Sequence, residues 1–264
     1  MEAAAKFFIG DFKFEANTPW GGWAAFFMSI SFFVFQIVIT VAIGTGLVVA
    51  LHGVEVFQGN TSASDVVSFI NIGILTLLAG YILTYGFILF VGGLQGGTIG
   101  EALLLKPSVN FGTNVVIGLV ALALFFLAFS FVVSTFFADD GVQSEAQMKE
   151  VFGLIGQSGF VWAGVAIIVV GAPFVEETIF RGFLLASLSK TRLGFWGGAV
   201  VSSALWASMH GYAASMAGGL FVFGMLLSWM VRRTGSIWVS ILMHAIWNGG
   251  VTMAIFTAIK AVEV

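Results

Sequence analysis

The chain of 264 residues contains no cysteine. This absence excludes a disulfide framework, a thiolate metal site and a cysteine nucleophile. Charged residues are also scarce, at 9%, where a soluble domain carries about 25%. The formal net charge is -3 and no run of basic residues occurs, which argues against a nucleic-acid partner.

Hydrophobic residues, by contrast, make up 59% of the chain, and the mean hydropathy is +1.06. These values indicate an integral membrane protein, in which each spanning helix needs about 20 mostly apolar residues. We predict an all-α polytopic bundle of about seven transmembrane helices, within a range of six to eight. The range arises because the fourth segment can split at Gly171 and Pro173, and the fifth is short. No polar linker is long enough to separate two domains, so residues 1–264 are expected to form one membrane domain. The predicted spans are Ala24–Leu51, Val67–Gly92, Val115–Phe137, Phe160–Leu188, Phe195–His210, Ala213–Val231 and Ile237–Ile259.

Orientation is predicted from lysine and arginine, which collect in short cytoplasmic loops. A cytoplasmic N-terminus gives the better fit, and it places the acidic segment 138–158 outside. The stretch 1–23 lacks the apolar run and cleavage site of a signal peptide, so we expect the first helix to be retained. Because no organelle signal is evident, we expect a multi-pass protein of the bacterial plasma membrane. The basic residues assigned to the inner side are Lys6, Lys13, Lys106, Lys190, Arg192, Arg232 and Arg233, and those on the outer side are Lys149 and Lys260.

The first three predicted spans carry no acidic, basic or histidine side chain between their ends. We therefore expect them to enclose a site rather than to supply its chemistry. Between the second and third spans, apolar residues 102–105 lie between Glu101 and Lys106. We expect this short stretch to lie along the inner headgroups.

The segment 172–183, A-P-F-V-E-E-T-I-F-R-G-F, places charges inside an apolar helix. A charged side chain at the bilayer centre costs about 2.5 to 3.5 kcal/mol on insertion scales, so such residues are usually paired and functional. Glu177 and Arg181 are four residues apart and can form an ion pair on one helix face. Glu176 is rotated by about 100° from Glu177, so the two carboxylates should differ in role. The less compensated one is a candidate general base or acid, although a buried cluster that only fixes helix packing would show the same pattern.

Two further polar pairs occur at the same helical spacing. Trp206 and His210 share one face in the fifth segment, and His244 and Asn248 share one face in the seventh. We predict that these residues converge with Glu176 on one polar cavity near the middle of the bilayer. A single intramembrane histidine is as often a packing residue, but two histidines with two glutamates and an asparagine favour a site.

The residue types suit an activated water. No G-x-S-x-G elbow is present, and neither is an H-E-x-x-H zinc motif. A glutamate assisted by a histidine could take a proton from water, while a second histidine and an asparagine stabilise the oxyanion of a peptide carbonyl. The set Glu176, His210 and His244 could instead hold a divalent metal such as zinc that activates the water. The residues alone leave both readings open.

These motifs resemble the CAAX prenyl protease and bacteriocin-processing family of intramembrane proteases, also called the Abi family. The resemblance covers about residues 172–248, the expected catalytic core. E-E-T-I-F-R at 176–181 is similar to the family's first motif, E-E-x-x-x-R, and H-A-I-W-N at 244–248 matches the third, H-x-x-x-N or D. W-A-S-M-H at 206–210 is similar to the second, which usually begins with phenylalanine.

The resemblance implies a water-filled cavity among membrane helices and a catalytic set. Glu176 would be the general base helped by His210, with His244 and Asn248 as the oxyanion pair, and with Glu177 and Arg181 polarising the site. The family has been described both as metalloendopeptidases and as glutamate proteases that use no metal. We favour the metal-free form, without a cofactor, because no third clean protein ligand is evident.

A peptide or protein substrate is expected, lipidated or not, together with membrane lipids as surroundings. Two other functions fit the same residues. One is a transporter in which the glutamates and histidines relay protons or bind a cation. The other is a family relative that binds a partner in the membrane without catalysis.

Overall fold

A computed structural model describes residues 14–54, 63–94, 98–108 and 110–262 of the chain. The described part is helical and contains no β-strand. Its elements are α2 (Gly22–His52), α3 (Ala63–Gly93), α4 (Ile99–Ala102), α5 (Phe111–Phe136), α6 (Ala138–Gln157), α7 (Val161–Ala166), η2 (Ile167–Gly171), α8 (Ala172–Glu177), η3 (Thr178–Leu185), α9 (Ala186–Leu188), α10 (Gly194–Ser208), α11 (Ala214–Thr234) and α12 (Trp238–Val262). The segments η2 and η3 are π-helical and join α7, α8 and α9 into one continuous helix.

Six helices of the described part are long and apolar enough to cross a membrane. They are α2, α3, α5, the continuous helix Val161–Leu188, α11 and α12. The predicted polytopic helical bundle is therefore confirmed, at the lower end of the predicted range of spans. The protein is a multi-pass membrane protein.

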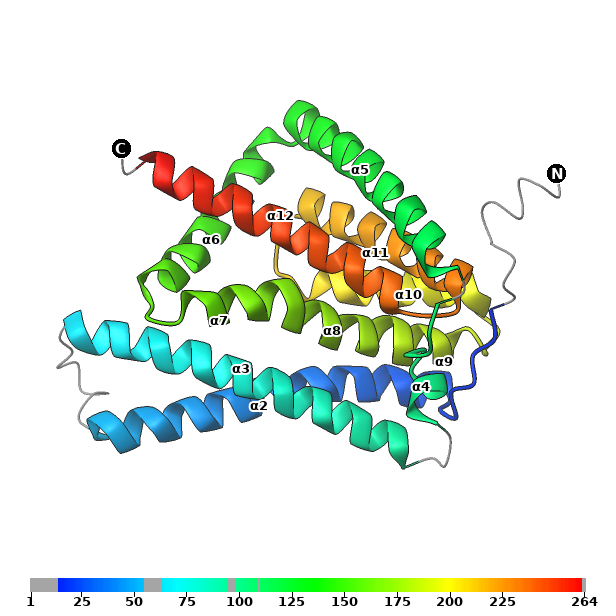
Figure 1. Ribbon diagram of the computed structural model, residues 1–264, viewed down its shortest axis with the longest axis horizontal. Helices are drawn as coiled ribbons and strands as arrows, with labels where there is room; N and C mark the ends of the chain where they lie inside the picture. The colour runs from blue at the N-terminus through cyan, green and yellow to red at the C-terminus, as the bar shows by residue number, and fades with distance from the viewer. Residues whose placement is uncertain (1–13, 55–62, 95–97, 109, 263–264) are drawn as a thin grey trace.

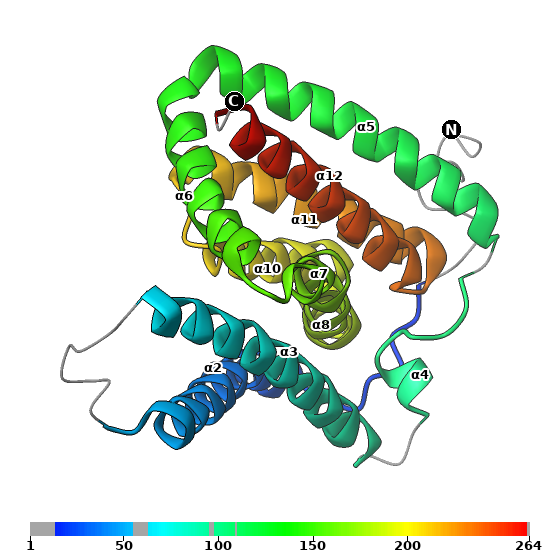
Figure 2. The ribbon, with the colours of Figure 1, turned by 60° about the vertical axis from the view of Figure 1, so that its left-hand side comes forward.

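The continuous helix α7–α9 forms the centre of the bundle. It runs between the pair α2 and α3 on one side and the group α10, α11 and α12 on the other (Figures 1 and 2). Every residue from Glu177 to Leu188 is buried, as expected for a helix with neighbours all round. Only 11% of the most apolar stretch of α5 is buried, against 50% for the central helix. The helix that carries the two glutamates is thus the one shielded from lipid.

The fifth predicted span, expected to be short, is not a spanning helix. Its helix, α10, has 15 residues and ends at Ser208, so it rises only about 22 Å. That is less than the hydrocarbon core of about 30 Å, and α10 is not among the six spanning helices. His210 consequently lies in the turn beyond α10 rather than on a helix face with Trp206. Gly211 adopts a φ of 67° there, a left-handed conformation that glycine favours.

Apolar residues 102–104, which follow Glu101, are buried in the protein, and a location of this stretch along the inner headgroups stays our prediction. Leu103 and Leu104 are 0% and 1% exposed. The carbonyl of Leu104 accepts a hydrogen bond from Ile237 N at 3.0 Å. A β-carbon at Gly182 would lie 2.4 Å from the Leu103 carbonyl oxygen, so glycine permits this close approach to η3. The apolar residues are buried because the segment packs against η3 at Gly182 and against Ile237, just before α12.

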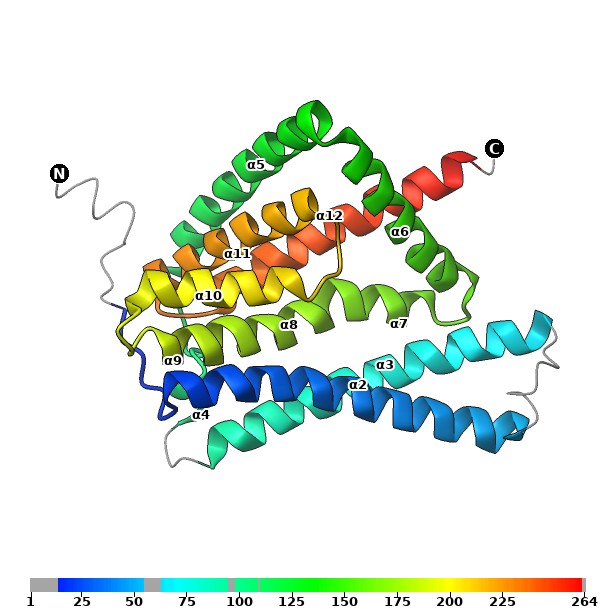
Figure 3. The ribbon, with the colours of Figure 1, turned by 180° about the vertical axis from the view of Figure 1, so that it is seen from behind.

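The connections between helices separate by charge. The segments that carry Lys106, Lys190, Arg192, Arg232 and Arg233 lie at one end of the bundle, where α2, α5, α10 and α12 begin (Figures 1 and 3). The acidic helix α6 lies at the opposite end (Figure 1). Lys6 and Lys13 lie outside the described residues. This arrangement follows the positive-inside rule, and a cytoplasmic N-terminus stays our prediction.

Candidate active site

Three elements bring the predicted site residues together. Glu176 and Glu177 end α8, Arg181 lies on η3, Trp206 lies near the end of α10, and His244 and Asn248 lie on α12. His210 lies in the turn after α10. The site thus forms where the central helix meets α10 and α12, which lie beside it (Figures 2 and 3).

Glu177 is the hub of a buried ionic cluster. Its Oε1 accepts hydrogen bonds from Arg181 Nη1 at 2.9 Å and from His244 Nδ1 at 3.0 Å. The side chains of Glu177 and Arg181 are 0% exposed. Arg181 Nη2 also donates to the Gly224 carbonyl at 3.2 Å. The ion pair expected from the four-residue spacing is present, and its glutamate also accepts a hydrogen bond from His244 on α12.

Glu176 lies in a different environment. Its Oε2 accepts a hydrogen bond from Trp206 Nε1 at 2.6 Å, and its side chain is 15% exposed. His244 Nε2 lies 3.9 Å from the same oxygen. An ionised carboxylate only accepts hydrogen bonds, so Nδ1 of His244 carries the proton shared with Glu177. The remaining nitrogen, Nε2, faces Glu176.

The backbone hydrogen-bond pattern is π-helical on both sides of α8. Asn248 donates a hydrogen bond to the π-helical segment on one side. Pro173 has no N–H, so the Ile168 carbonyl, five residues earlier, lacks its π-helical donor. The Ala172 N–H is used by Ile167. Asn248 Nδ2 donates to the Ile168 carbonyl at 2.9 Å. Because an amide nitrogen carries two hydrogens, Asn248 keeps one N–H for another acceptor.

His210 contacts the site through Trp206. Its Nδ1 lies 2.9 Å from the Trp206 carbonyl oxygen, and since a carbonyl only accepts, Nδ1 is the donor. The imidazole packs edge-on against the Trp206 ring and stacks on Tyr212. Within the described residues, the ion pairs of Glu176 and Glu177 involve Arg181 and His244 but not His210.

The proposed metal ligands are not assembled. In the ranges that the structure describes, no three His, Asp or Glu side chains lie close enough to hold one ion. Glu176 and His244 are neighbours, whereas His210 is directed to a backbone carbonyl. The residues present therefore do not fit the three-ligand metal site that the sequence left open.

Two tyrosines, Tyr81 and Tyr212, lie close enough to Glu176 to interact with its charge, and the sequence did not predict them. Burial and the charge of Glu176 raise the pKa of Tyr212 above its ordinary value of 10. Tyr81 on α3 also interacts with the charge of Glu176 and forms a side-chain hydrogen bond with Gln36 on α2. Tyr85 forms a side-chain hydrogen bond with Thr178. The chain contains only three tyrosines, and all of them lie around this site. Tyrosine is rare in this aromatic-rich sequence, and this rarity was the one feature of the sequence that could have drawn attention to these residues.

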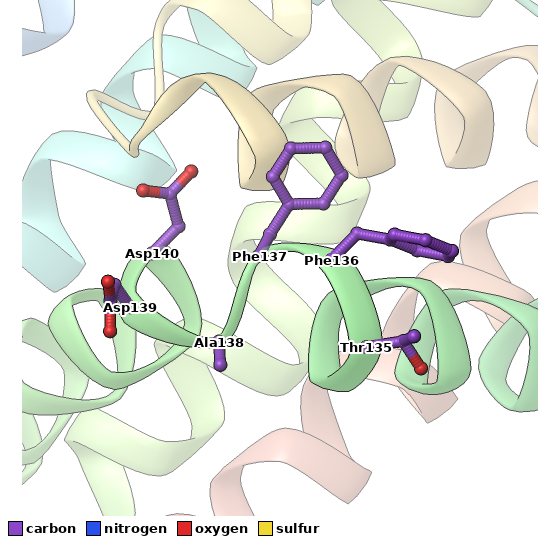
Figure 4. A pocket seen from close by; sticks show the side chains of 6 residues that line it. All are labelled: Thr135, Phe136, Phe137, Ala138, Asp139 and Asp140. Atoms are coloured by element: carbon purple, nitrogen blue, oxygen red, sulfur yellow. The ribbon is translucent and has the colours of Figure 1, made fainter.

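One surface hollow lies elsewhere. It has a volume of about 360 Å³ and is lined by residues 135–140, where α5 meets α6 (Figure 4). Asp140 in this hollow accepts a hydrogen bond from Ser215 at 2.6 Å. None of its lining residues belongs to the predicted catalytic set, so the hollow is separate from the candidate site.

Comparison with known proteins supports the motif assignment. Residues 158–250 match the model of a family described as type II CAAX prenyl endopeptidase, Rce1-like. The match includes all of the predicted core, 172–248, and confirms the resemblance. Neither the curated proteins nor the solved structures contain a match to this chain.

Proposed function

We propose, from the type II CAAX prenyl endopeptidase domain that residues 158–250 carry, that this chain hydrolyses peptide bonds within the membrane by an activated water. The observation that carries the proposal is the buried row of Arg181, Glu177 and His244, which ends beside Glu176. In this row Glu177 is hydrogen-bonded to Arg181 and His244. Glu176 accepts neither hydrogen bond, so the two adjacent carboxylates can have different roles in acid–base catalysis.

Glu176 is the proposed general base. It is the more exposed of the two carboxylates and has no cationic side chain of lysine or arginine bonded to it. Its carboxylate takes a proton from water as the water oxygen bonds to the peptide carbonyl carbon. The same proton then passes to the leaving amine as the C–N bond breaks, so Glu176 is regenerated.

His244 and Asn248 are the proposed oxyanion donors. With Nδ1 bonded to Glu177, His244 can donate through Nε2 only as an imidazolium. Two ionised glutamates and Arg181 carry a net charge of -1, and an imidazolium at His244 neutralises the cluster. A buried cluster without net charge is less costly than a charged one, which supports this protonation state. The second N–H of Asn248 completes the pair.

His210 is the proposed helper of the water. Since Nδ1 donates to the Trp206 carbonyl, the neutral ring leaves Nε2 as an acceptor. As an acceptor, Nε2 can hold the second hydrogen of the attacking water. Glu177 and Arg181 polarise His244 rather than contact the substrate.

The test is cleavage of a quenched fluorescent farnesylated CAAX peptide by the purified protein in detergent. The wild type is expected to turn over, and Glu176→Gln to lose about 10²-fold or more of kcat. Glu150→Gln, a change on the exposed acidic helix α6, is the matched control and should retain wild-type turnover. A strong chelator should leave the rate unchanged.

Other outcomes would redirect the proposal. Loss of turnover on chelation, with recovery on adding zinc, would assign water activation to a metal. No turnover of prenylated or unprenylated peptides, combined with proton or cation flux in proteoliposomes that Glu176→Gln abolishes, would contradict hydrolysis and assign transport.

A further inference from the structure

We propose that Trp206 is a positioning residue of this site, whose indole N–H orients the Glu176 carboxylate and stabilises its ionised form. The inference rests on the proposed function for its catalytic consequence and on the hydrogen bond for its structural one. The bond from Nε1 to Glu176 Oε2 measures 2.6 Å, and Trp206 is 1% exposed. A short bond in a buried site is the geometry of a strong, charge-assisted donor.

The indole is held in place on several sides. The Arg181 guanidinium lies 4.8 Å from its ring centroid. The rings of His210, His244 and Phe223 pack around it at centroid distances of 4.9, 5.4 and 6.1 Å. A side chain packed in this way cannot change rotamer without disturbing all its neighbours. The direction of the N–H is therefore fixed before any substrate binds.

Arg181 is not hydrogen-bonded to Glu176, because its two terminal nitrogens are directed to other acceptors. One of its terminal nitrogens donates to Glu177 and the other to the Gly224 carbonyl. Among the described residues, no second side chain donates a hydrogen bond to Glu176. Trp206 is thus the side chain that donates a hydrogen bond to Glu176, and it does so without adding a positive charge.

An indole suits a group that must take a proton and release it again. It donates a hydrogen bond but cannot accept one. It therefore stabilises the carboxylate more than the carboxylic acid. An arginine in its place would add a full positive charge and disfavour protonation of the carboxylate more strongly. Phenylalanine, which usually begins this motif in the family, has the ring but not the donor.

The kinetic test compares Trp206→Phe with wild type over a range of pH, with the farnesylated peptide as substrate. Loss of one hydrogen bond to the ionised carboxylate should move the acidic limb of kcat/KM to higher pH by about one unit, with KM changed less than twofold. Trp247→Phe is the matched control: this indole packs on Phe125 and Phe223 in the same core. An unmoved acidic limb in Trp206→Phe would overturn the catalytic role.

A second measurement does not depend on activity. In protein labelled with ¹⁵N-tryptophan, the indole resonance of Trp206 is identified by its loss in Trp206→Phe. It should be shifted downfield, should titrate with pH, and should lose this titration in Glu176→Gln. A resonance that is indifferent to both pH and Glu176→Gln would overturn the inference even if the enzyme is active. A titrating resonance in a protein without peptidase activity would uphold the bond and contradict only the proposed function.

Discussion

Two consecutive glutamates receive different partners because a helix rotates successive side chains by about 100°. Glu177 points to Arg181 and His244, and Glu176 points to Trp206. The first ion pair was predictable from sequence because it lies within one helix turn. The partner of Glu176 was not, since it lies on another helix and depends on how the two helices pack.

The buried pair Glu177–Arg181 can be tested by breaking it. Arg181→Met leaves Glu177 buried without its cation, which should cost about 3–5 kcal/mol of unfolding free energy. Adding Glu177→Gln should recover most of that loss, because no uncompensated charge then remains. Lys149→Met breaks the exposed pair with Glu145 and should cost at most about 1 kcal/mol. Unfolding in detergent measures all three variants, and equal losses for Arg181→Met and Lys149→Met would contradict the buried assignment.

Tyr212 offers a test by pH. Its pKa is raised by burial first and by the charge of Glu176 second. A raised folded-state pKa adds stability that is complete below pH 10 and is lost as the pH rises through the folded-state value. In Tyr81→Phe/Tyr85→Phe, Tyr212 is the sole tyrosine, and its tyrosinate absorbance should appear above pH 10.

Adding Glu176→Gln to that variant should lower the Tyr212 midpoint, while burial keeps it above 10. A midpoint that Glu176→Gln leaves unchanged would show that the hydroxyl and the carboxylate do not interact.

At the scale of elements, the π-helical segments η2 and η3 flank α8, which carries Glu176 and Glu177. Such bulges are frequent at functional sites. Pro173 was visible in the sequence as a helix breaker, and the predicted span 160–188 could have split there. The span continues as one helix, and Asn248 from α12 satisfies the carbonyl that the proline leaves open. That contact joins residues 80 apart, and sequence spacing could not predict it.

This contact predicts a coupling between Asn248 and Pro173. Asn248→Ala leaves the Ile168 carbonyl unpaired and should cost about 1–3 kcal/mol of stability. In a Pro173→Ala background the restored N–H can bond to that carbonyl, so the same change should cost less. A double-mutant cycle from unfolding in detergent measures the coupling. Strict additivity of the two changes would contradict it.

At the scale of the whole molecule, apolar run length predicted the bundle well. It gave the six spanning helices to within a few residues at most ends. The reason is that about 20 consecutive apolar residues are typical of a helix that crosses the hydrocarbon core. Apolar run length failed for α10, which is too short to span although it is apolar. Part of its surface is buried by protein, as are Leu103 and Leu104, and hydropathy does not distinguish a protein interior from lipid.

Orientation can be tested because the chain has no cysteine of its own. We expect Glu150→Cys on α6 to react with an impermeant maleimide in right-side-out vesicles. Arg192→Cys, between α9 and α10, should react only in inside-out vesicles. Both positions are exposed, so a difference in labelling reports the side of the membrane. The reverse pattern would place the N-terminus outside.

The short helix α10 affects the surrounding bilayer as well as the site. Its end and the turn 209–213 lie below the level that a full-length span would reach, and backbone groups in hydrocarbon must find hydrogen-bond partners. We therefore expect water or lipid headgroups to approach this turn, with a locally thinner bilayer beside it. On this expectation, the thickness of the surrounding membrane sets how far water must travel to reach Glu176.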